Sequence, residues 1–208
     1  MKLYYDETMN PRKVCALAKH VGAPVTYVHV RLNKGEHQTA DFLAINPNGK
    51  VPALQDGDTT LWESNAIMAY LARAASSDLW PQDGGKQVEV LRWLSWDTQH
   101  FSRYAGNLYF EHIIKPQFAL GAPDAASAAQ ATAYFRQYGR ILNDHLRGRQ
   151  YLLGDTLTIA DFAVAVTLPY AERARIPVGD FPEMARWHDR LNELAAWRDP
   201  FPTIAAAA

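Results

Sequence analysis

The stretch from Lys50 to Ile67 reads KVPALQDGDTTLWESNAI and does most to define the fold. Residues 51–54 and 59–62 are rich in the side chains that favour short strands. Asp56-Gly57-Asp58 separates them and is typical of a hairpin turn. Ser64 follows at a position typical of the start of a helix, and the apolar residues after it keep helical spacing. The stretch therefore predicts a β-hairpin that leads directly into a helix.

Short strand-like and helix-like segments alternate before this stretch. Residues 3–5 and 25–30 favour strands, and Pro11 between them is expected to open a helix that ends at Gly22. A further short helix is expected near residues 39–45. The predicted order is β-α-β-α-β-β-α, and we expect it to form a domain over residues 1–77.

The remainder of the chain shows helical periodicity and no convincing strand pattern. Residues 81–85 have the composition of a linker, and a second, all-α domain is expected over residues 86–208. Its capping-box variant places Thr158 at a helix start and Asp161 where it can reach back to the backbone of Thr158. The predicted class is α+β, with the clearest helical stretches at residues 88–104, 127–146, 159–174 and 183–194.

Composition excludes several classes of function. The chain has 208 residues, 48% of them hydrophobic, and a formal net charge of −1, so it lacks the basic surface that nucleic acids or anionic membranes require. We expect neither as a partner. The chain contains one cysteine, Cys15, which we interpret as a packing residue, and it has no segment typical of a signal peptide or membrane span. We therefore expect a cytoplasmic protein.

Two motifs carry a resemblance to a known family. The chain lacks a phosphate-binding glycine loop, a Cys-x-x-Cys pair and the common hydrolase motifs. Lys50-Val51-Pro52-Ala53-Leu54 and Trp62-Glu63-Ser64-Asn65-Ala66-Ile67, however, resemble the glutathione transferases, as do Thr158 to Asp161, Gly154-Asp155 and Arg186-Trp187. Lys34 to His37 and Thr8-Met9-Asn10 are similar to theta-class and nu-like bacterial members. The resemblance implies a thioredoxin-like domain that binds glutathione, followed by an all-helical domain that shapes a site for an electrophile.

Glu63 and Ser64 suit the γ-glutamyl end of glutathione, which carries an α-carboxylate and an α-ammonium together. Ser64 can offer a hydroxyl and a backbone N–H to the carboxylate at the positive end of a helix dipole, and Glu63 can pair with the ammonium. The alternative is that Ser64 is only a helix cap and Glu63 only an acid favoured by the dipole. The resemblance favours the binding role.

The remaining glutathione contacts follow from the resemblance. It implies a cis bond between Val51 and Pro52, which turns the backbone of Val51 toward the cysteinyl part of the ligand. It also implies that Lys50 and His37 lie near the glycyl carboxylate. Each of these two side chains, taken alone, is typical of a solvated surface.

Activation of the sulfur requires a donor to the thiolate, because a thiol with an ordinary pKa near 8.5 is mostly protonated at neutral pH. Thr8, Asn10 and Tyr5 lie near the junction of the first strand and first helix. Thr8 is our first choice, with Asn10 sharing the role as in nu-like enzymes. Asn10 can instead be a cap before Pro11, and Tyr5 can instead be a core residue of the strand.

The electrophile site is expected in the helical domain. Aromatic residues between Trp93 and His112 keep helical spacing, and most should belong to the core. His100, Arg103 and Tyr104 are our candidates for contacting the electrophile. The expected enzyme is a homodimer for detoxification that uses glutathione as a co-substrate, with no metal and no permanently bound cofactor. The alternatives are a glutathione-dependent disulfide-bond reductase and a non-catalytic, transferase-like binding protein.

Overall fold

The computed structural model describes residues 1–203, which form two compact units. The first contains Met1–Trp80 together with residues 194–203, and the second is Pro81–Glu193. The expected domains, 1–77 and 86–208, differ from this division mainly at the end of the chain. There the described residues return to the first unit.

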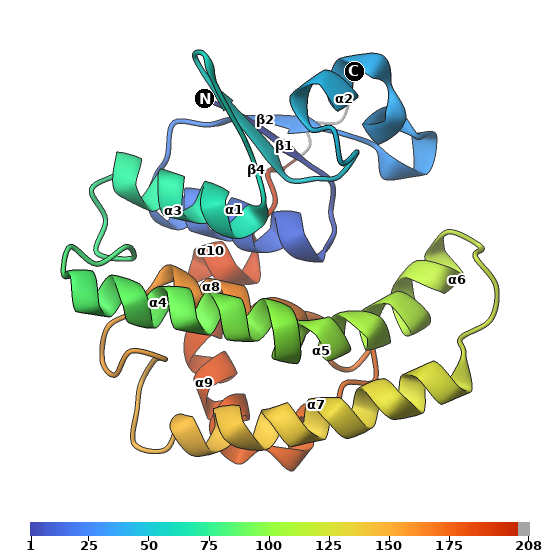
Figure 1. Ribbon diagram of the computed structural model, residues 1–208, viewed down its shortest axis with the longest axis vertical. Coiled ribbons are helices and arrows are strands. Elements are labelled where there is room, and N and C mark those ends of the chain that lie inside the picture. The colour runs from blue at the N-terminus through green and yellow to red at the C-terminus, as the bar shows by residue number, and fades with distance from the viewer. Residues whose placement is uncertain (204–208) are drawn as a thin grey trace. The chain divides into compact units, whose positions relative to one another are not determined.

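The first unit is built on a four-stranded sheet with the order β2-β1-β3-β4 (Figure 1). β1 and β2 are parallel, whereas β3 is antiparallel to both β1 and β4. The predicted β-α-β-α-β-β-α order is therefore confirmed, with two short 3-10 turns added. The elements are β1 (Lys2–Tyr5), α1 (Met9–His20), β2 (Thr26–His29), η1 (Leu32–Lys34), η2 (Glu36–Gln38), α2 (Ala40–Ile45), β3 (Ala53–Asp56), β4 (Thr59–Trp62) and α3 (Ser64–Ala74).

Alternation along the strands gives the sheet two apolar faces. Tyr4 of β1 packs with Phe42 of α2, with ring centroids 6.0 Å apart, and Ala53 belongs to the same buried cluster. Leu3 and Leu54 point to the opposite face and are fully buried. Figure 1 shows α1 and α3 on that side of the sheet and α2 on the other. The two layers of helices therefore hold the strand ends and their loops in fixed positions.

The segment that follows residue 194 packs against α1. Helix α10 (Ala195–Arg198) brings the fully buried Trp197 to this helix. Arg12 donates a hydrogen bond to the carbonyl oxygen of Trp197 at 2.7 Å, and its guanidinium lies 5.6 Å from the indole centroid. Lys19 donates to the carbonyl oxygens of Asp199 and Phe201 at 2.6 and 3.1 Å. These contacts explain why the last described residues do not continue the helical unit.

The second unit is helical, as predicted, and its described residues contain no strand beyond the isolated bridge between Tyr151 and Gly154. The expected helix at residues 88–104 is part of a longer run interrupted by two π-helical turns. None of the described helices has the length and apolarity needed to cross a membrane. The elements are α4 (Gly84–Trp96), η3 (Asp97–Phe101), α5 (Ser102–Tyr109), η4 (Phe110–Ile114), α6 (Lys115–Gln117), α7 (Ala125–His145), α8 (Ile159–Val164), η5 (Ala165–Tyr170), η6 (Val178–Asp180) and α9 (Pro182–Asn192).

A buried carboxylate organises the start of α8. Asp161 accepts the backbone N–H groups of Thr158 and Leu152, both at 2.9 Å, which confirms the predicted reach back to Thr158. It also accepts the Thr158 hydroxyl and the indole N–H of Trp187, both at 3.1 Å. Burial raises the pKa of Asp161 to about 6, although these hydrogen bonds oppose the rise. Leu152, Thr158 and Trp187 all belong to the second unit, so this carboxylate stabilises the unit from within.

Candidate functional site

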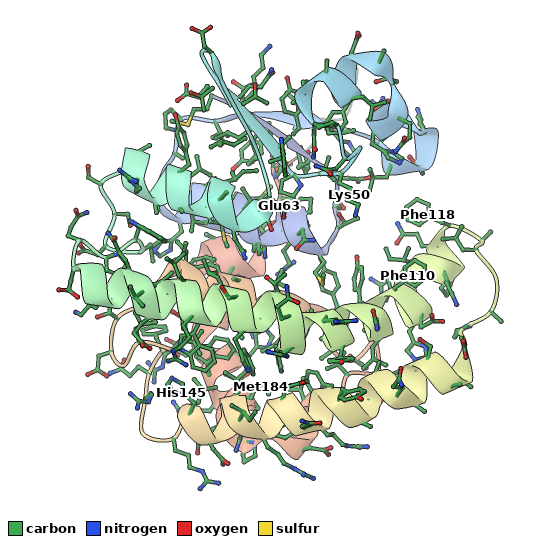
Figure 2. The ribbon with its side chains drawn as sticks, in the orientation of Figure 1. Lys50, Glu63, Phe110, Phe118, His145 and Met184 are labelled. Atoms are coloured by element: carbon green, nitrogen blue, oxygen red, sulfur yellow. The ribbon has the colours of Figure 1, made fainter. Side chains whose placement is uncertain are left out.

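A cavity of about 100 Å³ opens in the first unit where three segments meet. The start of α1, the loop between α2 and β3, and the junction of β4 with α3 supply its walls. We call it the α3 cavity. Figure 2 shows Lys50 and Glu63 close to one another in this part of the molecule. Its lining residues are Asn10, Asn46, Asn48, Lys50, Val51, Pro52, Glu63 and Ser64.

The N-terminus of α3 forms one wall. The helix begins at Ser64, so Glu63 occupies the N-cap position that we had expected for Ser64. Glu63 has a φ of 72°, in the left-handed region that non-glycine residues rarely adopt. Ser64 is 8% exposed, and within residues 1–203 its hydroxyl has no hydrogen-bond partner. The first backbone N–H groups of the helix are also left without intrahelical acceptors, as at any helix start. This wall therefore presents donors and a partial positive charge.

The loop after α2 is held by a buried asparagine. Asn46 is 2% exposed and donates from its amide to the carbonyl oxygen of Lys50 at 2.6 Å. Its Oδ1 accepts the backbone and side-chain N–H groups of Asn48 at 3.1 and 2.9 Å. Gly49 has a φ of 58°, and a Cβ there would lie 2.6 Å from the amide nitrogen of Gln38. The loop is thus fixed by its own contacts before any ligand arrives.

The predicted cis peptide bond between Val51 and Pro52 is confirmed. Strand β3 begins only at Ala53, so Val51 lies outside the sheet ladder. Across residues 1–203, neither the N–H nor the C=O of Val51 has a hydrogen-bond partner. A backbone unit with both groups free at a cavity wall can pair with an extended peptide.

The N-terminus of α1 approaches the same cavity. The helix begins at Met9 with Thr8 as N-cap, so the interpretation of Asn10 as the cap is wrong. Asn10 is instead the second helical residue and lines the cavity. The Thr8 hydroxyl makes no capping hydrogen bond, and Thr8 is not among the lining residues. The preceding Asp6 anchors the loop through the backbone N–H of Leu32 at 2.9 Å and through His29 at 3.1 Å.

The cavity collects opposite charges that do not pair with one another. In the described part of the chain, the side chains of Asn10, Lys50, Glu63 and Ser64 have no hydrogen-bond or ion-pair partner. A carboxylate, an ammonium, a hydroxyl and an amide therefore face one cavity with their capacity unused. This arrangement complements a ligand that itself carries both signs of charge.

Comparison with known proteins shows which family this chain belongs to. A model of the glutathione S-transferase N-terminal domain matches residues 1–73, and a model of the C-terminal domain matches residues 124–205. Glutathione S-transferase 3 of Zea mays is 34% identical, covering 99% of this chain and 94% of its own. The chain belongs to the glutathione S-transferase family. A Hyoscyamus muticus glutathione S-transferase is 30% identical, covering 95% of each chain. A Burkholderia graminis glutathione transferase, solved with two glutathione molecules bound per subunit, superposes with a TM-score of 0.84 and 26% identity over 99% of this chain and 89% of its own.

The family motifs Lys50-Val51-Pro52 and Glu63-Ser64 meet with Asn10 in the α3 cavity. His37 lies in η2, outside the lining, with its Nδ1 buried and without a partner. Two further lining residues, Asn46 and Asn48, were not predicted. The only signal for them was the sequence Asn46-Pro47-Asn48-Gly49, which directly follows the short helix expected near residues 39–45.

Tyr5 and Cys15 are packing residues in this glutathione S-transferase fold. Tyr5 is 2% exposed and stacks on His29 and Phe201 with centroid distances of 5.2 and 6.1 Å. Burial also raises the pKa of its hydroxyl. Cys15 is fully buried, and burial raises the pKa of its thiol to about 12, which leaves it unreactive at neutral pH.

The three electrophile candidates lie together in the helical unit. His100 stacks on Tyr138 at 4.9 Å, and Tyr104 stacks on Tyr134 at 4.5 Å, between ring centroids. The guanidinium of Arg103 lies 5.8 Å from the centroid of Tyr104. These residues form an aromatic surface that joins η3 and α5 to α7, which is a contact network that spacing alone did not predict.

Proposed function

We propose that this protein is a glutathione transferase that binds glutathione in the α3 cavity, stabilises its thiolate, and adds it to a hydrophobic electrophile or uses it to reduce a hydroperoxide. The observation that carries the proposal is the set of unpaired groups in the cavity. Among residues 1–203, the side chains of Lys50, Glu63 and Ser64 have no partner, and the charges of Lys50 and Glu63 are opposite to those of the tripeptide groups that they would meet.

The γ-glutamyl end of glutathione binds at the N-terminus of α3. Its carboxylate binds the Ser64 hydroxyl and backbone N–H, where the helix dipole favours negative charge. Its ammonium pairs with Glu63, which the unusual backbone conformation holds beside Ser64. The cavity has room for one end of a peptide rather than for the whole tripeptide, so the rest lies along the loop.

The cysteinyl and glycyl residues of glutathione bind along the loop between α2 and β3. The cysteinyl backbone pairs with the free N–H and C=O of Val51, as an added strand pairs with a sheet edge. The glycyl carboxylate meets the Lys50 ammonium, whose loop is held by Asn46. We place His37 as an outer contributor to the same carboxylate, through the unpartnered Nδ1 of its ring.

Thr8 and Asn10 supply the donor to sulfur. Lowering the thiol pKa by about 2 units requires about 2.7 kcal/mol, and one hydrogen bond to a charged acceptor contributes about 1.5 to 3 kcal/mol. The hydroxyl of Thr8, which makes no capping hydrogen bond, and the amide of Asn10, the second residue of the helix, are suited to this role. The electrophile is received by the surface of His100, Arg103 and Tyr104.

A disulfide-bond reductase is the second candidate function. The Thr8-Met9-Asn10 pattern, with Asn10 at the cavity, is similar to nu-like bacterial enzymes and favours this activity. The class assignment, theta-like or nu-like, depends on these residues together with Lys34 to His37. The full-length relatives from Zea mays and Hyoscyamus muticus are plant proteins, so they support the family and not this class.

Substrate comparison tests these proposals. Rates with glutathione should be measured on chlorodinitrobenzene, cumene hydroperoxide and a glutathione-linked disulfide, after retention on immobilised glutathione has been checked. Turnover of the first two substrates supports a transferase, and faster turnover of the disulfide supports the reductase. Absence of both retention and turnover would contradict the enzyme and favour a transferase-like binding protein.

We also propose a cytoplasmic homodimer that functions in detoxification. Exposed apolar side chains support the dimer, namely Trp62 on the edge strand β4, 43% exposed, and Val88 and Leu91 on α4, 63% and 50% exposed. Sedimentation at micromolar concentration tests this assembly, and a monomer under those conditions would contradict it.

A further inference from the structure

A second cavity, which we call the α7 groove, lies on the helical unit and has a volume of about 460 Å³. One wall is a face of α7, and the other is the junction of η6 with α9. The groove shares no residue with the α3 cavity. Its lining residues are Arg136, Arg140, Asn143, Asp144, Arg147, Asp180 and Phe181.

The floor of the groove is preformed. A Cβ on Gly139 would lie 2.8 Å from two carbons of the Phe181 ring, so this glycine lets the ring lie directly against α7. Asn143 Oδ1 accepts the backbone N–H groups of Glu183 and Met184 at 2.9 and 3.4 Å. Met184, labelled in Figure 2, marks the start of α9 at this point. The two walls are thus connected through buried contacts.

The groove contains hydrogen-bond donors that no acceptor within residues 1–203 satisfies. Arg136 pairs with Asp180 at 2.7 Å, and Arg147 pairs with Asp144 at 2.8 Å. The guanidinium of Arg140 and the amide nitrogen of Asn143 have no partner among the described residues. Asn143 is only 8% exposed and lies in the floor, and its amide nitrogen can be reached from the groove. Arg140 and Asn143 are three positions apart on α7 and share one face.

We propose that the α7 groove binds one oxyanionic group of a small molecule, a carboxylate or a phosphate, through Arg140 and Asn143. Both groups present only hydrogen-bond donors here, and guanidinium matches the oxygens of either anion in a bidentate way. The three arginines of the lining exceed its two aspartates by a single positive charge. That balance suits one anionic group, whereas Asp144 and Asp180 repel a polyanion. The volume leaves room for an organic body beyond the anion.

Titration with simple anions tests the site in the full-length protein without glutathione. Sodium phosphate and sodium acetate are added separately at constant ionic strength, and two-dimensional NMR follows the side-chain signals of Arg140 and Asn143. Saturable shifts are expected with at least one anion below about 50 mM. Saturation with phosphate alone identifies phosphate esters as the ligand class, and saturation with acetate alone identifies carboxylic acids.

Matched variants separate this site from general electrostatics. Arg140→Gln should weaken anion binding by about tenfold or more, since it removes the central donor. Arg173→Gln removes the same charge from an exposed position of the same unit outside the groove and should change binding less than about twofold. Ser64→Ala should have no effect, because it alters only the α3 cavity. The proposal is overturned if neither anion saturates, or if Arg140→Gln and Arg173→Gln behave alike.

Discussion

The N-termini of helices α3 and α8 contain similar residues but differ in whether the side chains of those residues are hydrogen-bonded. Each combines a hydroxyl residue with an acid within three positions, Glu63 with Ser64 in one and Thr158 with Asp161 in the other. Asp161 is completely buried and accepts hydrogen bonds from groups on Leu152, Thr158 and Trp187. Glu63 and Ser64 make no side-chain hydrogen bond within the described residues and face a cavity. The saturated terminus therefore stabilises the fold, and the unsaturated terminus is available for a ligand.

The largest expected effect is on stability. Asp161→Ala leaves the donors of Thr158, Leu152 and Trp187 buried without an acceptor and should lower the free energy of unfolding by about 3 to 5 kcal/mol. The Glu63 side chain makes no hydrogen bond or ion pair with residues 1–203, so Glu63→Ala should lower the free energy of unfolding by less than about 1 kcal/mol. Urea unfolding measures both variants. Equal losses would remove the distinction between the two termini.

The pH dependence of stability sharpens the same contrast. The pKa of Asp161 in the folded protein, about 6, lies above the ordinary aspartate value near 3.9, so folding favours the protonated carboxyl. Its contribution is fully present below about pH 4 and is lost as the pH rises through 6. The difference in unfolding free energy between wild type and Asp161→Asn should therefore fall by roughly 2 to 3 kcal/mol from pH 4 to pH 7. A difference that stays constant over this range would show that the pKa of Asp161 is ordinary.

At the other terminus, Ser64→Ala should affect binding and not chemistry. The variant loses a hydrogen bond to the glutathione carboxylate, which is made equally in the ground and transition states. We expect KM for glutathione to rise about tenfold while kcat at saturation changes less than about twofold. Steady-state kinetics with varied glutathione measures both values. An unchanged KM would refute the role of Ser64.

The smallest expected effect concerns the sulfur. If Thr8 is the main donor, Thr8→Val should raise the apparent pKa of bound glutathione by about 1 unit, with turnover recovering partly in alkali. Asn10→Ala should then raise this pKa less than Thr8→Val does. If Asn10 is the main donor, Asn10→Ala should raise the pKa more than Thr8→Val. Asn10→Asp should then raise it most, because it places a carboxylate beside the sulfur. Rates over a pH series measure the shift, after glutathione binding by each variant has been checked. Wild-type profiles for both Thr8→Val and Asn10→Ala would show that neither residue activates the sulfur and would leave the helix dipole as the source of activation.

Local sequence patterns predicted which helices and strands form better than they predicted the residues at which these begin. Strand β4 begins where the hairpin sequence indicates, because the turn residues before it fix its start. Helix α3 begins at Ser64, one residue earlier than a cap at Ser64 implies. Helix α1 begins earlier than predicted, since Pro11 lacks an N–H that the first turn of a helix does not need. Strand β3 begins later, at Ala53, because Pro52 cannot donate to the ladder.

Long-range contacts account for what the sequence could not show. The motifs at Lys50-Val51-Pro52 and Glu63-Ser64 carry their own family signal, so the residues that line this part of the α3 cavity could be named from the sequence. Asn46 is buried and its side chain donates a hydrogen bond to the carbonyl oxygen of Lys50 across the loop. Such a loop contact leaves no periodic pattern in the sequence. The return of the chain end depends on Arg12 and Lys19 finding acceptors roughly 180 positions away. Nothing in local spacing encodes such pairs.

A crystal structure of the protein with glutathione tests the central claim most directly. The account predicts the γ-glutamyl carboxylate at the hydroxyl and backbone N–H of Ser64, its ammonium at Glu63, and the cysteinyl backbone paired with Val51. The sulfur should lie within hydrogen-bonding distance of the Thr8 hydroxyl or the Asn10 amide. Glutathione bound elsewhere, with the N-terminus of α3 still unoccupied at saturating concentration, would contradict the account.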